Sequence, residues 1–478
     1  MKKHTRRGIT IFLALILALT AINISVFAED AVSADTTEAA EPAETAEETD
    51  PAEVSEAAEP ADPAEATTES YTLERAVVLS RHNIRSPLSG SGSLLGDITP
   101  HEWFQWTSNP SELSLKGGIL ETRMGQYFRL WLENEGLFPE NYRPEDDSVR
   151  IYANSKQRTL ATAHYFSAGL LPAGNVSVES HGEYDTMDPT FNPVLTYFTD
   201  DYVEAVQDQI AEMGGDAGME GFHDDLRDAI TLLMDVTDMD ESEAYEAGTY
   251  GDLLTDETTV QLEPDKEASM TGPIKTATSV ADALTFQLYE MEDGQAAAFG
   301  HDLTTEDWQK LHTIVDTYTE ILFETPLISV NAAHPLLEEL RSEFETGGRK
   351  FSFLCGHDSN VATVLSALGT EEYLLPDAVE QHTPIGVKLV FSRWLNEDDE
   401  AFWSAELVYQ NLDQLLDMRP LTLADPPAKY ALDFEGVEKN ADGLIAESDF
   451  MAMFDRAISA YDELDDQYGE MYALDNAA

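Results

Sequence analysis

Three short apolar segments, far apart in the chain, each lead directly into a polar turn and then into a helical pattern. They are residues 76–79, 149–152 and 351–355, followed by turns at Arg81, Asn154 and Gly356. This repeated succession is typical of an α/β fold with a mostly parallel central sheet flanked by helices. Ligands of such sheets bind beyond the carboxyl ends of the strands, so we expect the three turns to converge on one crevice.

The middle of the chain has a different pattern. Between residues 195 and 329 it is rich in acidic, Ala- and Leu-containing amphipathic stretches such as 202–213 and 305–323. We therefore expect a mainly helical cap, residues 195–329, inserted into an α/β core built from residues 71–194 and 330–470. A chain of 478 residues is long enough for such a core and a further subdomain.

The first 70 residues are expected to lie outside the core. Four basic residues precede an apolar run at 9–26, so residues 1–28 resemble a signal peptide and predict a secreted or extracytoplasmic protein. The run is long for a signal, which leaves an uncleaved membrane anchor as the alternative. Residues 29–70 consist largely of Ala, Glu, Thr, Pro and Asp, and predict a disordered acidic linker.

The charge of the chain limits its partners. A formal net charge of −65 argues against nucleic acid and against an anionic membrane surface, because both would repel the protein. We expect no stable membrane partner unless the N-terminal segment stays uncleaved. Cys355 is the only cysteine, so the chain cannot form an internal disulfide and its stability must come from packing.

The turn after the first apolar segment places a histidine between two arginines. It reads Arg-His-Asn-Ile-Arg-Ser-Pro over residues 81–87. An imidazole beside guanidinium groups is disfavoured as a cation, and planar guanidinium groups match phosphate oxygens two at a time. The pattern predicts His82 as a nucleophile in an anion pocket formed with Arg81 and Arg85.

The other two turns supply complementary groups. The segment 152–159 contributes Arg158, and the segment 356–360, Gly-His-Asp-Ser-Asn, contributes a donor at His357 and a proton at Asp358. Phosphoryl transfer needs little beyond positioning and charge neutralisation, so no cofactor is expected. No histidine has the spacing of metal ligands. Residues 438–449 imitate a calcium loop but begin with Glu and end with Asp, so we expect a plain hairpin there and no metal.

Together these motifs resemble the histidine acid phosphatases, branch 2 of the histidine phosphatase superfamily. The family pattern has Arg-His-Gly-x-Arg-x-Pro near the start and His-Asp near the end. Asn83 in place of the usual Gly, and the segments 186–193 and 383–386, make the chain most similar to bacterial glucose-1-phosphatases. The resemblance runs from about residue 73 to residue 450, and it implies a phosphoglycerate-mutase-like core.

The resemblance also implies a role for each site residue. His82 would attack phosphorus, and Asp358 would protonate the leaving alcohol, which requires a neutral imidazole, a protonated carboxyl and hence an acidic optimum. Glu290 would stand at the pocket rim. The phosphoryl oxygens would be held by Arg81, Arg85, Arg158 and His357.

Several functions remain open at this point. A small sugar phosphate such as glucose 1-phosphate is favoured over phytate, because the segment 88–92 is neutral where phytate would favour lysines or arginines. Phytase activity is the main alternative. A phosphomutase is less expected of an exported chain, and the intact motifs argue against a surface binding protein without turnover.

Overall fold

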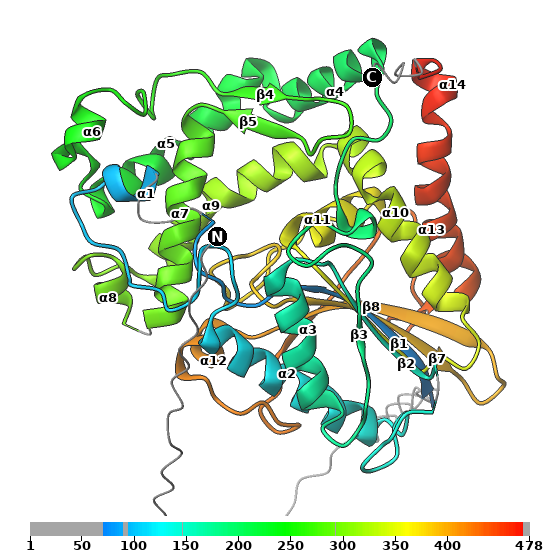
Figure 1. Ribbon diagram of the computed structural model, residues 1–478. Coiled ribbons are helices and arrows are strands. Elements are labelled where there is room, and N and C mark those ends of the chain that lie inside the picture. Colours follow the sequence, from blue (N-terminus) through cyan, green and yellow to red (C-terminus); the bar gives the residue numbers. More distant parts are fainter. Residues whose placement is uncertain (1–69, 89–93, 146, 292, 472–478) are drawn as a thin grey trace, which may run out of the picture. The chain divides into compact units, whose positions relative to one another are not determined.

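The computed structural model describes residues 70–88, 94–145, 147–291 and 293–471 (Figure 1). The expected signal segment and all but the last residue of the expected acidic linker lie outside these residues, so both remain predictions. None of the helices in the described part of the chain is long and apolar enough to cross a membrane.

The centre of the described part is a mixed sheet of eight strands. Seven of them follow the order β10-β8-β7-β1-β6-β2-β3, and β9 pairs with β8. Strands β1, β6, β2 and β3 run parallel, whereas β7, β8, β9 and β10 join by antiparallel pairing. The strand bounds are β1 Thr72–Arg81, β2 Val149–Ala153, β3 Val178–Glu179, β6 Phe351–Gly356, β7 Lys388–Leu395, β8 Ala401–Tyr409, β9 Ala428–Ala431 and β10 Ile445–Ala446.

Strand β1 shows why the sheet is covered on both faces. Val77 and Leu79 belong to a core cluster with side chains of α10, α11 and α13, whereas Ala76 and Val78 belong to a second cluster with α2 and α3. Side chains alternate along a strand, and here both sets are fully buried. A strand enclosed on both faces has a continuous apolar sequence, which is the pattern that predicted the parallel sheet.

Helices flank both faces of this sheet, and further helices, α4 to α9, lie in the part of the chain between β3 and β6. Figure 1 shows α2 and α3 on one side of the sheet and α10, α11 and α13 on the other. The helix bounds are α1 Leu94–Asp97, α2 Leu115–Asn134, α3 Gln157–Leu170, α4 Asp200–Met213, α5 Met219–Val236, α6 Glu243–Glu246, α7 Pro273–Met291, α8 Gly294–Ala297, α9 Thr305–Thr319, α10 Pro326–Glu345, α11 Asp358–Ala367, α12 Leu412–Asp417, α13 Glu447–Asp462 and α14 Leu464–Tyr468.

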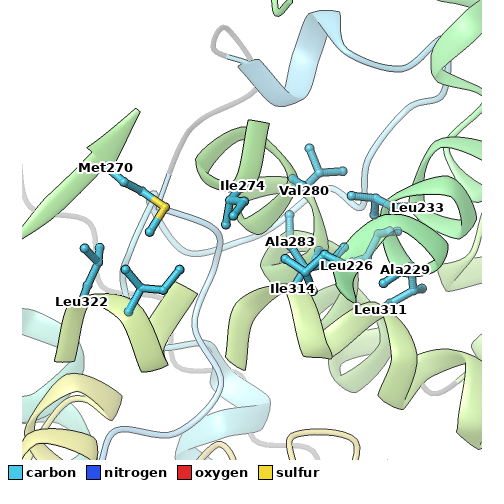
Figure 2. Packing of buried hydrophobic residues seen from close by; sticks show 14 of the residues in the cluster. Leu226, Ala229, Leu233, Met270, Ile274, Val280, Ala283, Leu311, Ile314 and Leu322 are labelled. Carbon is cyan, nitrogen blue, oxygen red and sulfur yellow. The ribbon is translucent and has the colours of Figure 1, made fainter. Parts of the chain in front are cut away.

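Residues 195–329 have their own apolar interior, formed largely by α5, α7 and α9. Figure 2 shows Leu226 and Leu233 of α5 near Val280 of α7 and Ile314 of α9, and all four side chains are almost fully buried. A two-stranded hairpin, β4 Thr259–Gln261 with β5 Ser269–Thr271, precedes α7, and a π-helical turn, Glu320–Glu324, follows α9. The same apolar cluster also includes side chains outside residues 195–329, such as Ile84 and Leu120. The prediction that residues 195–329 form a separate domain remains untested.

The α/β class and the parallel strands at the centre are confirmed. The antiparallel strands beyond β1 were not predicted, because β7 and β8 lie next to each other in sequence and pair locally. An antiparallel hairpin needs only a short turn, whereas parallel neighbours need a crossover helix. The strand–turn–helix pattern therefore indicated only the parallel half of the sheet.

Candidate active site

The three polar turns meet at one edge of the parallel strands. In the sheet register Arg81 lies beside Gly356, and Cys355 lies beside Ala153, so His82, His357 and Asn154 leave the sheet at the same level. A cavity of about 260 Å³ opens there. We call the residues that line it from these turns the core wall: His82, Arg85, Arg158, His357 and Asp358.

The backbone fixes the orientation of the His82 ring. Its Nδ1 lies 2.9 Å from the backbone oxygen of Asn83. A carbonyl can only accept, so in the neutral ring Nδ1 carries the proton and Nε2 keeps its lone pair. Burial, reinforced by the charges of Arg158 and Arg85, lowers the pKa of His82 well below its usual 6.5. The ring is therefore neutral and nucleophilic at acidic pH.

His357 has the same Nδ1–H tautomer, but a side chain sets it from the other ring nitrogen. The side-chain amide of Asn154 donates from Nδ2 to His357 Nε2 at 2.6 Å, and the amide is held in this orientation because its Oδ1 accepts from the Asp188 N–H at 2.9 Å. In the neutral ring, His357 Nδ1 therefore carries the proton. Arg158 Nη2 lies 3.2 Å from that Nδ1, so two donors meet at the cavity. One acceptor, such as a phosphate oxygen, fits both.

Asp358 differs from the sequence-based expectation. Its Oδ2 lies 3.0 Å from Arg81 Nη2, and its Oδ1 accepts from the Ser359 N–H at 2.9 Å. Burial alone would raise the pKa of Asp358, but Arg81 and Arg85 outweigh it and lower the pKa to about 2. Without substrate these charges therefore favour the ionised form of Asp358, and the expected proton remains a prediction for the substrate-bound enzyme. A phosphate dianion beside these arginines would offset their effect and raise that pKa again.

Arg81 lies beneath the cavity and is not among the residues that line it. The side chain is almost fully buried, and Nη1 donates to Glu380 Oε1 and to the Thr383 carbonyl, both at 2.5 Å. Although burial opposes the charged form, Glu380 and Asp358 raise the pKa of Arg81 above its usual value. Glu380 also accepts from Tyr289 Oη at 3.1 Å, so it links the guanidinium to α7.

Helix α7 brings a second set of side chains to the cavity. Lys275, Thr278, Ser279 and Asp282 follow the i, i+3, i+4, i+7 spacing of one helix face. Asp282 lies 3.3 Å from Arg85 Nη2 and thereby joins this face to the core wall. We call four polar lining residues from residues 195–329 the cap wall: Glu267, Lys275, Asp282 and Tyr318.

The structure places Glu290 away from the cavity, in contrast to the predicted position at the pocket rim. This residue is not among the described residues that line the cavity, and it lies eight positions beyond Asp282, about 12 Å along the helix axis. Its carboxylate accepts from the hydroxyl of Ser114, the N-cap residue of α2, at 2.8 Å. The acidic residues that residues 195–329 contribute to the cavity are Asp282 and Glu267.

The charges of the cap wall are strongly perturbed. Although Glu267 is exposed as a whole residue, desolvation of its carboxyl group at the cavity and the nearby Asp358 carboxylate raise its pKa to about 7, against the opposing effect of Lys275. Burial lowers the pKa of Lys275, whose Nζ lies 3.3 Å from Tyr318 Oη and 4.6 Å from the centre of that ring. Glu267 thus changes its charge near neutral pH, which is uncommon for a glutamate.

Comparison with known proteins places this geometry in a family. The sequence profile of the histidine phosphatase superfamily (branch 2) matches residues 72–410. A glucose-1-phosphatase of Providencia rettgeri is 34% identical over 396 residues, covering 81% of this chain and 92% of the relative. The chain belongs to branch 2 of the histidine phosphatase superfamily. It is a histidine-type phosphomonoesterase.

Two further relatives of this histidine phosphatase are informative. A glucose-1-phosphatase of Salmonella typhimurium is 35% identical over 381 residues, covering 79% of this chain and 90% of the relative. Among solved structures, a Hafnia alvei phytase in complex with tartrate is 26% identical, with a TM-score of 0.75 over 82% of this chain and 98% of the phytase. The expected family and fold are confirmed.

Sequence motifs found the core wall of this phosphatase but missed other parts of the site. The missed residues are Asn154, Glu267, Lys275, Asp282, Tyr318 and Glu380. Asn154 stands within a motif and had a usable signal, namely its position at the end of a strand. The carboxylates and Lys275 had none, because isolated charges in so acidic a chain are usually solvated.

Proposed function

We propose that the enzyme hydrolyses small sugar phosphates, such as glucose 1-phosphate, through a phosphohistidine on His82. The observation that carries the proposal is the unprotonated Nε2 of His82 beside three donors, Arg85, Arg158 and His357, in one cavity. These donors would hold the phosphoryl oxygens. Arg81, which pairs with Asp358, would add positive charge below these donors. We also propose that Arg81 contacts a phosphoryl oxygen directly.

The reaction proceeds in two steps. His82 Nε2 attacks phosphorus, the bond between phosphorus and the ester oxygen breaks, and the leaving oxygen takes a proton from Asp358. Water then attacks the phosphohistidine, gives a proton to the Asp358 carboxylate, and the nitrogen–phosphorus bond breaks to release phosphate. Positioned donors and cations stabilise the charge on the phosphoryl oxygens in both transition states.

The proton on Asp358 has a source in the substrate. The second pKa of a phosphate monoester is about 6, so at lower pH the substrate arrives as a monoanion that carries a proton. Binding beside Arg81 and Arg85 offsets the charges that keep the pKa of Asp358 near 2. The proton can then move to Asp358, which supports an acidic optimum.

The cap wall supports a small substrate with one phosphate. Glu267 and Asp282 line the cavity, and a carboxylate repels each nearby phosphate by about 1 kcal/mol in water and by more where solvent is excluded. Phytate carries several phosphates, so these two carboxylates would repel it more strongly than a sugar monophosphate. Phytase activity is the second candidate, favoured by the single cation Lys275 among the cap-wall residues.

We further propose that the enzyme works outside the cytoplasm. The proposal is supported by the basic residues and the apolar run at the start of the sequence, which resemble an export signal. Fractionation of cells that express the full chain tests it. Activity confined to the cytoplasm, with the N-terminal segment still attached, would contradict it.

The direct test of the proposed function compares wild type with His82→Ala on a panel of sugar phosphates, phytate and nitrophenyl phosphate. Wild type is expected to prefer a sugar monophosphate and to form an acid-labile, base-stable phosphoenzyme. His82→Ala should lose at least roughly 1,000-fold in kcat with an unchanged melting temperature. Substantial turnover by the variant would refute the mechanism, and a wild-type preference for phytate would favour the second candidate.

A further inference from the structure

A fully buried ion pair lies behind the turn that carries His82. Lys388, the first residue of β7, and Glu121 of α2 both have side chains with 0% exposure, and Lys388 Nζ lies 2.9 Å from Glu121 Oε1. The desolvation of two buried charges offsets much of the free energy of their attraction. Well-packed apolar side chains of similar volume therefore often stabilise a protein at least as much as a buried ion pair does. The pair is therefore weak evidence for stability, and its contacts indicate another role.

Glu121 reaches the nucleophile through Asn83. The side-chain amide of Asn83 donates from Nδ2 to Glu121 Oε2 at 2.9 Å, and its Oδ1 accepts from the Ile84 N–H at 2.9 Å. These two bonds fix both ends of the amide. The backbone oxygen of the same residue is the acceptor for His82 Nδ1. Glu121 thus holds the peptide group that sets the tautomer of the imidazole.

Lys388 reaches the nucleophile from the other side. Its Nζ donates to the Gly386 carbonyl at 2.7 Å, and the Gly386 N–H donates to the backbone oxygen of His82 at 3.1 Å. Residue 386 has φ +68°, and a Cβ there would lie 2.6 Å from Asn83 Nδ2, so glycine is required. The bonds through Asn83, Glu121, Lys388 and Gly386 form a closed ring that begins and ends at His82.

We propose that Glu121 and Lys388 are positioning residues for phosphoryl transfer, which hold the His82 ring with Nδ1–H on the Asn83 carbonyl and Nε2 toward the substrate. The proposal rests on the proposed function of His82. Neither residue is among those that line the cavity, so their effect on the rate must pass through the orientation of the imidazole. A displacement of about 1 Å in a reacting group can cost about 100-fold in rate.

The test uses the double variant Glu121→Gln/Lys388→Met, which removes both charges and leaves neither one alone in the core. Rapid-quench measurement of phosphoenzyme formation from nitrophenyl phosphate should show a rate roughly 10- to 100-fold below wild type. The dissociation constant of inorganic phosphate should stay near the wild-type value. Histidine ¹⁵N NMR at acidic pH should show that the single Nδ1–H tautomer of His82 is replaced by a mixture.

The matched control is Glu343→Gln, which also neutralises a buried carboxylate. Glu343 Oε1 lies 2.7 Å from Arg150 Nη1, and its Oε2 accepts from Ser352 near the start of β6, away from the ring of bonds at His82. We expect this variant to form the phosphoenzyme at the wild-type rate, even if its melting temperature falls. A similar loss of rate in the control would mean that general destabilisation explains the effect, and it would overturn the inference.

A double variant that folds, keeps the wild-type phosphorylation rate and retains one His82 tautomer would also overturn the inference. If the double variant does not fold, Asn83→Ala cuts the link to Glu121 and leaves the ion pair intact, and it should slow phosphorylation in the same direction. An unchanged rate in Asn83→Ala would then be decisive against the inference. A wild type that forms no phosphoenzyme would instead refute the proposed function.

Discussion

The core wall and the cap wall line the same cavity but are built in different ways. The core wall comes from turns at strand ends, where a few consecutive residues deliver His82 and Arg85, or His357 and Asp358. The cap wall comes from one face of α7 and from single residues such as Glu267 and Tyr318. The core wall gathers Arg85 and Arg158 around His82, whereas the cap wall places two carboxylates beside one lysine. We infer that the first performs the chemistry and the second selects the substrate.

The carboxylates show the same difference. In the core wall, arginines overcome burial and lower the pKa of Asp358 to about 2. In residues 195–329, desolvation of the carboxyl group dominates and raises the pKa of the half-buried Glu324, and of Glu267 at the cavity, to about 7. The position of a carboxyl group relative to the arginines therefore decides whether it is charged at the acidic pH where the enzyme is expected to work.

The largest expected effect belongs to the core wall. Asp358→Asn should lower kcat for glucose 1-phosphate by roughly 100- to 10,000-fold, because its alcohol leaves poorly without a proton. Nitrophenyl phosphate, whose leaving group needs little proton donation, should lose far less. Steady-state kinetics with both substrates measure the difference. Equal losses would mean that Asp358 is not the general acid and that the core wall has been assigned wrongly.

A smaller effect is expected from the cap wall. Glu267 gains its negative charge as the pH rises through about 7, and it then repels a substrate dianion. Glu267→Gln lacks this charge, so the ratio of its kcat/KM to that of wild type should rise from about one at pH 5 to about five at pH 8, which corresponds to about 1 kcal/mol. Phytate should gain more than glucose 1-phosphate.

The matched control for this effect is Glu290→Gln. Glu290 is a glutamate near the end of α7 that bonds to Ser114 instead of lining the cavity. Its substitution should leave the ratio of phytate to glucose 1-phosphate turnover unchanged at every pH. A pH-independent ratio in Glu267→Gln, or a shift in Glu290→Gln, would remove the selective role from the cap wall.

The smallest expected effect concerns stability. The folded-state pKa of Glu324 lies above its usual 4.5, so between pH 4.5 and 7 the folded protein binds more protons than the unfolded chain. The free energy of unfolding must therefore fall as the pH rises through this window. We expect this group to contribute about 1–2 kcal/mol of the loss.

Urea unfolding of wild type and Glu324→Gln at pH 5 and pH 8 checks this prediction. The variant should lose less stability between the two pH values than wild type, with unchanged activity at pH 5. An equal loss in both proteins would show that Glu324 ionises near its usual pKa, and the contrast between core and cap carboxylates would then be restricted to Glu267.

What could be predicted follows from how local each feature is in sequence. His82 and Asp358 were predictable because each stands in a short motif at the end of a buried apolar strand. Asp282 was not, because a single carboxylate on a helix carries no sign of which helix face meets the cavity. Glu290 was expected at the pocket rim for the same reason. The antiparallel half of the sheet escaped prediction because the strand–turn–helix pattern marks parallel strands only, whereas β7 joins β8 by a short turn and pairs with β1 from a distant part of the chain.

The protonation of Asp358 could not be predicted from residue types alone. The motif places an acid beside the nucleophile, but its pKa depends on the distance to Arg81, which the fold sets at 3.0 Å. Likewise, the motif includes Asn83 without indicating that Glu121 and Lys388, distant in sequence, close a ring of bonds around it. The pairing of Glu121 with Lys388 is determined by the packing of α2 against β1 and β7.

The most direct test of the account is the identity of the phosphorylated atom. Acid-quench conditions destroy phosphohistidine, so the phosphoenzyme should be trapped with base, digested at high pH and examined by mass spectrometry and ³¹P NMR. The account predicts a single phosphoryl group on Nε2 of His82, because the Asn83 carbonyl holds the proton on Nδ1. Phosphate on Nδ1 of His82, on His357 or on any other residue would contradict it.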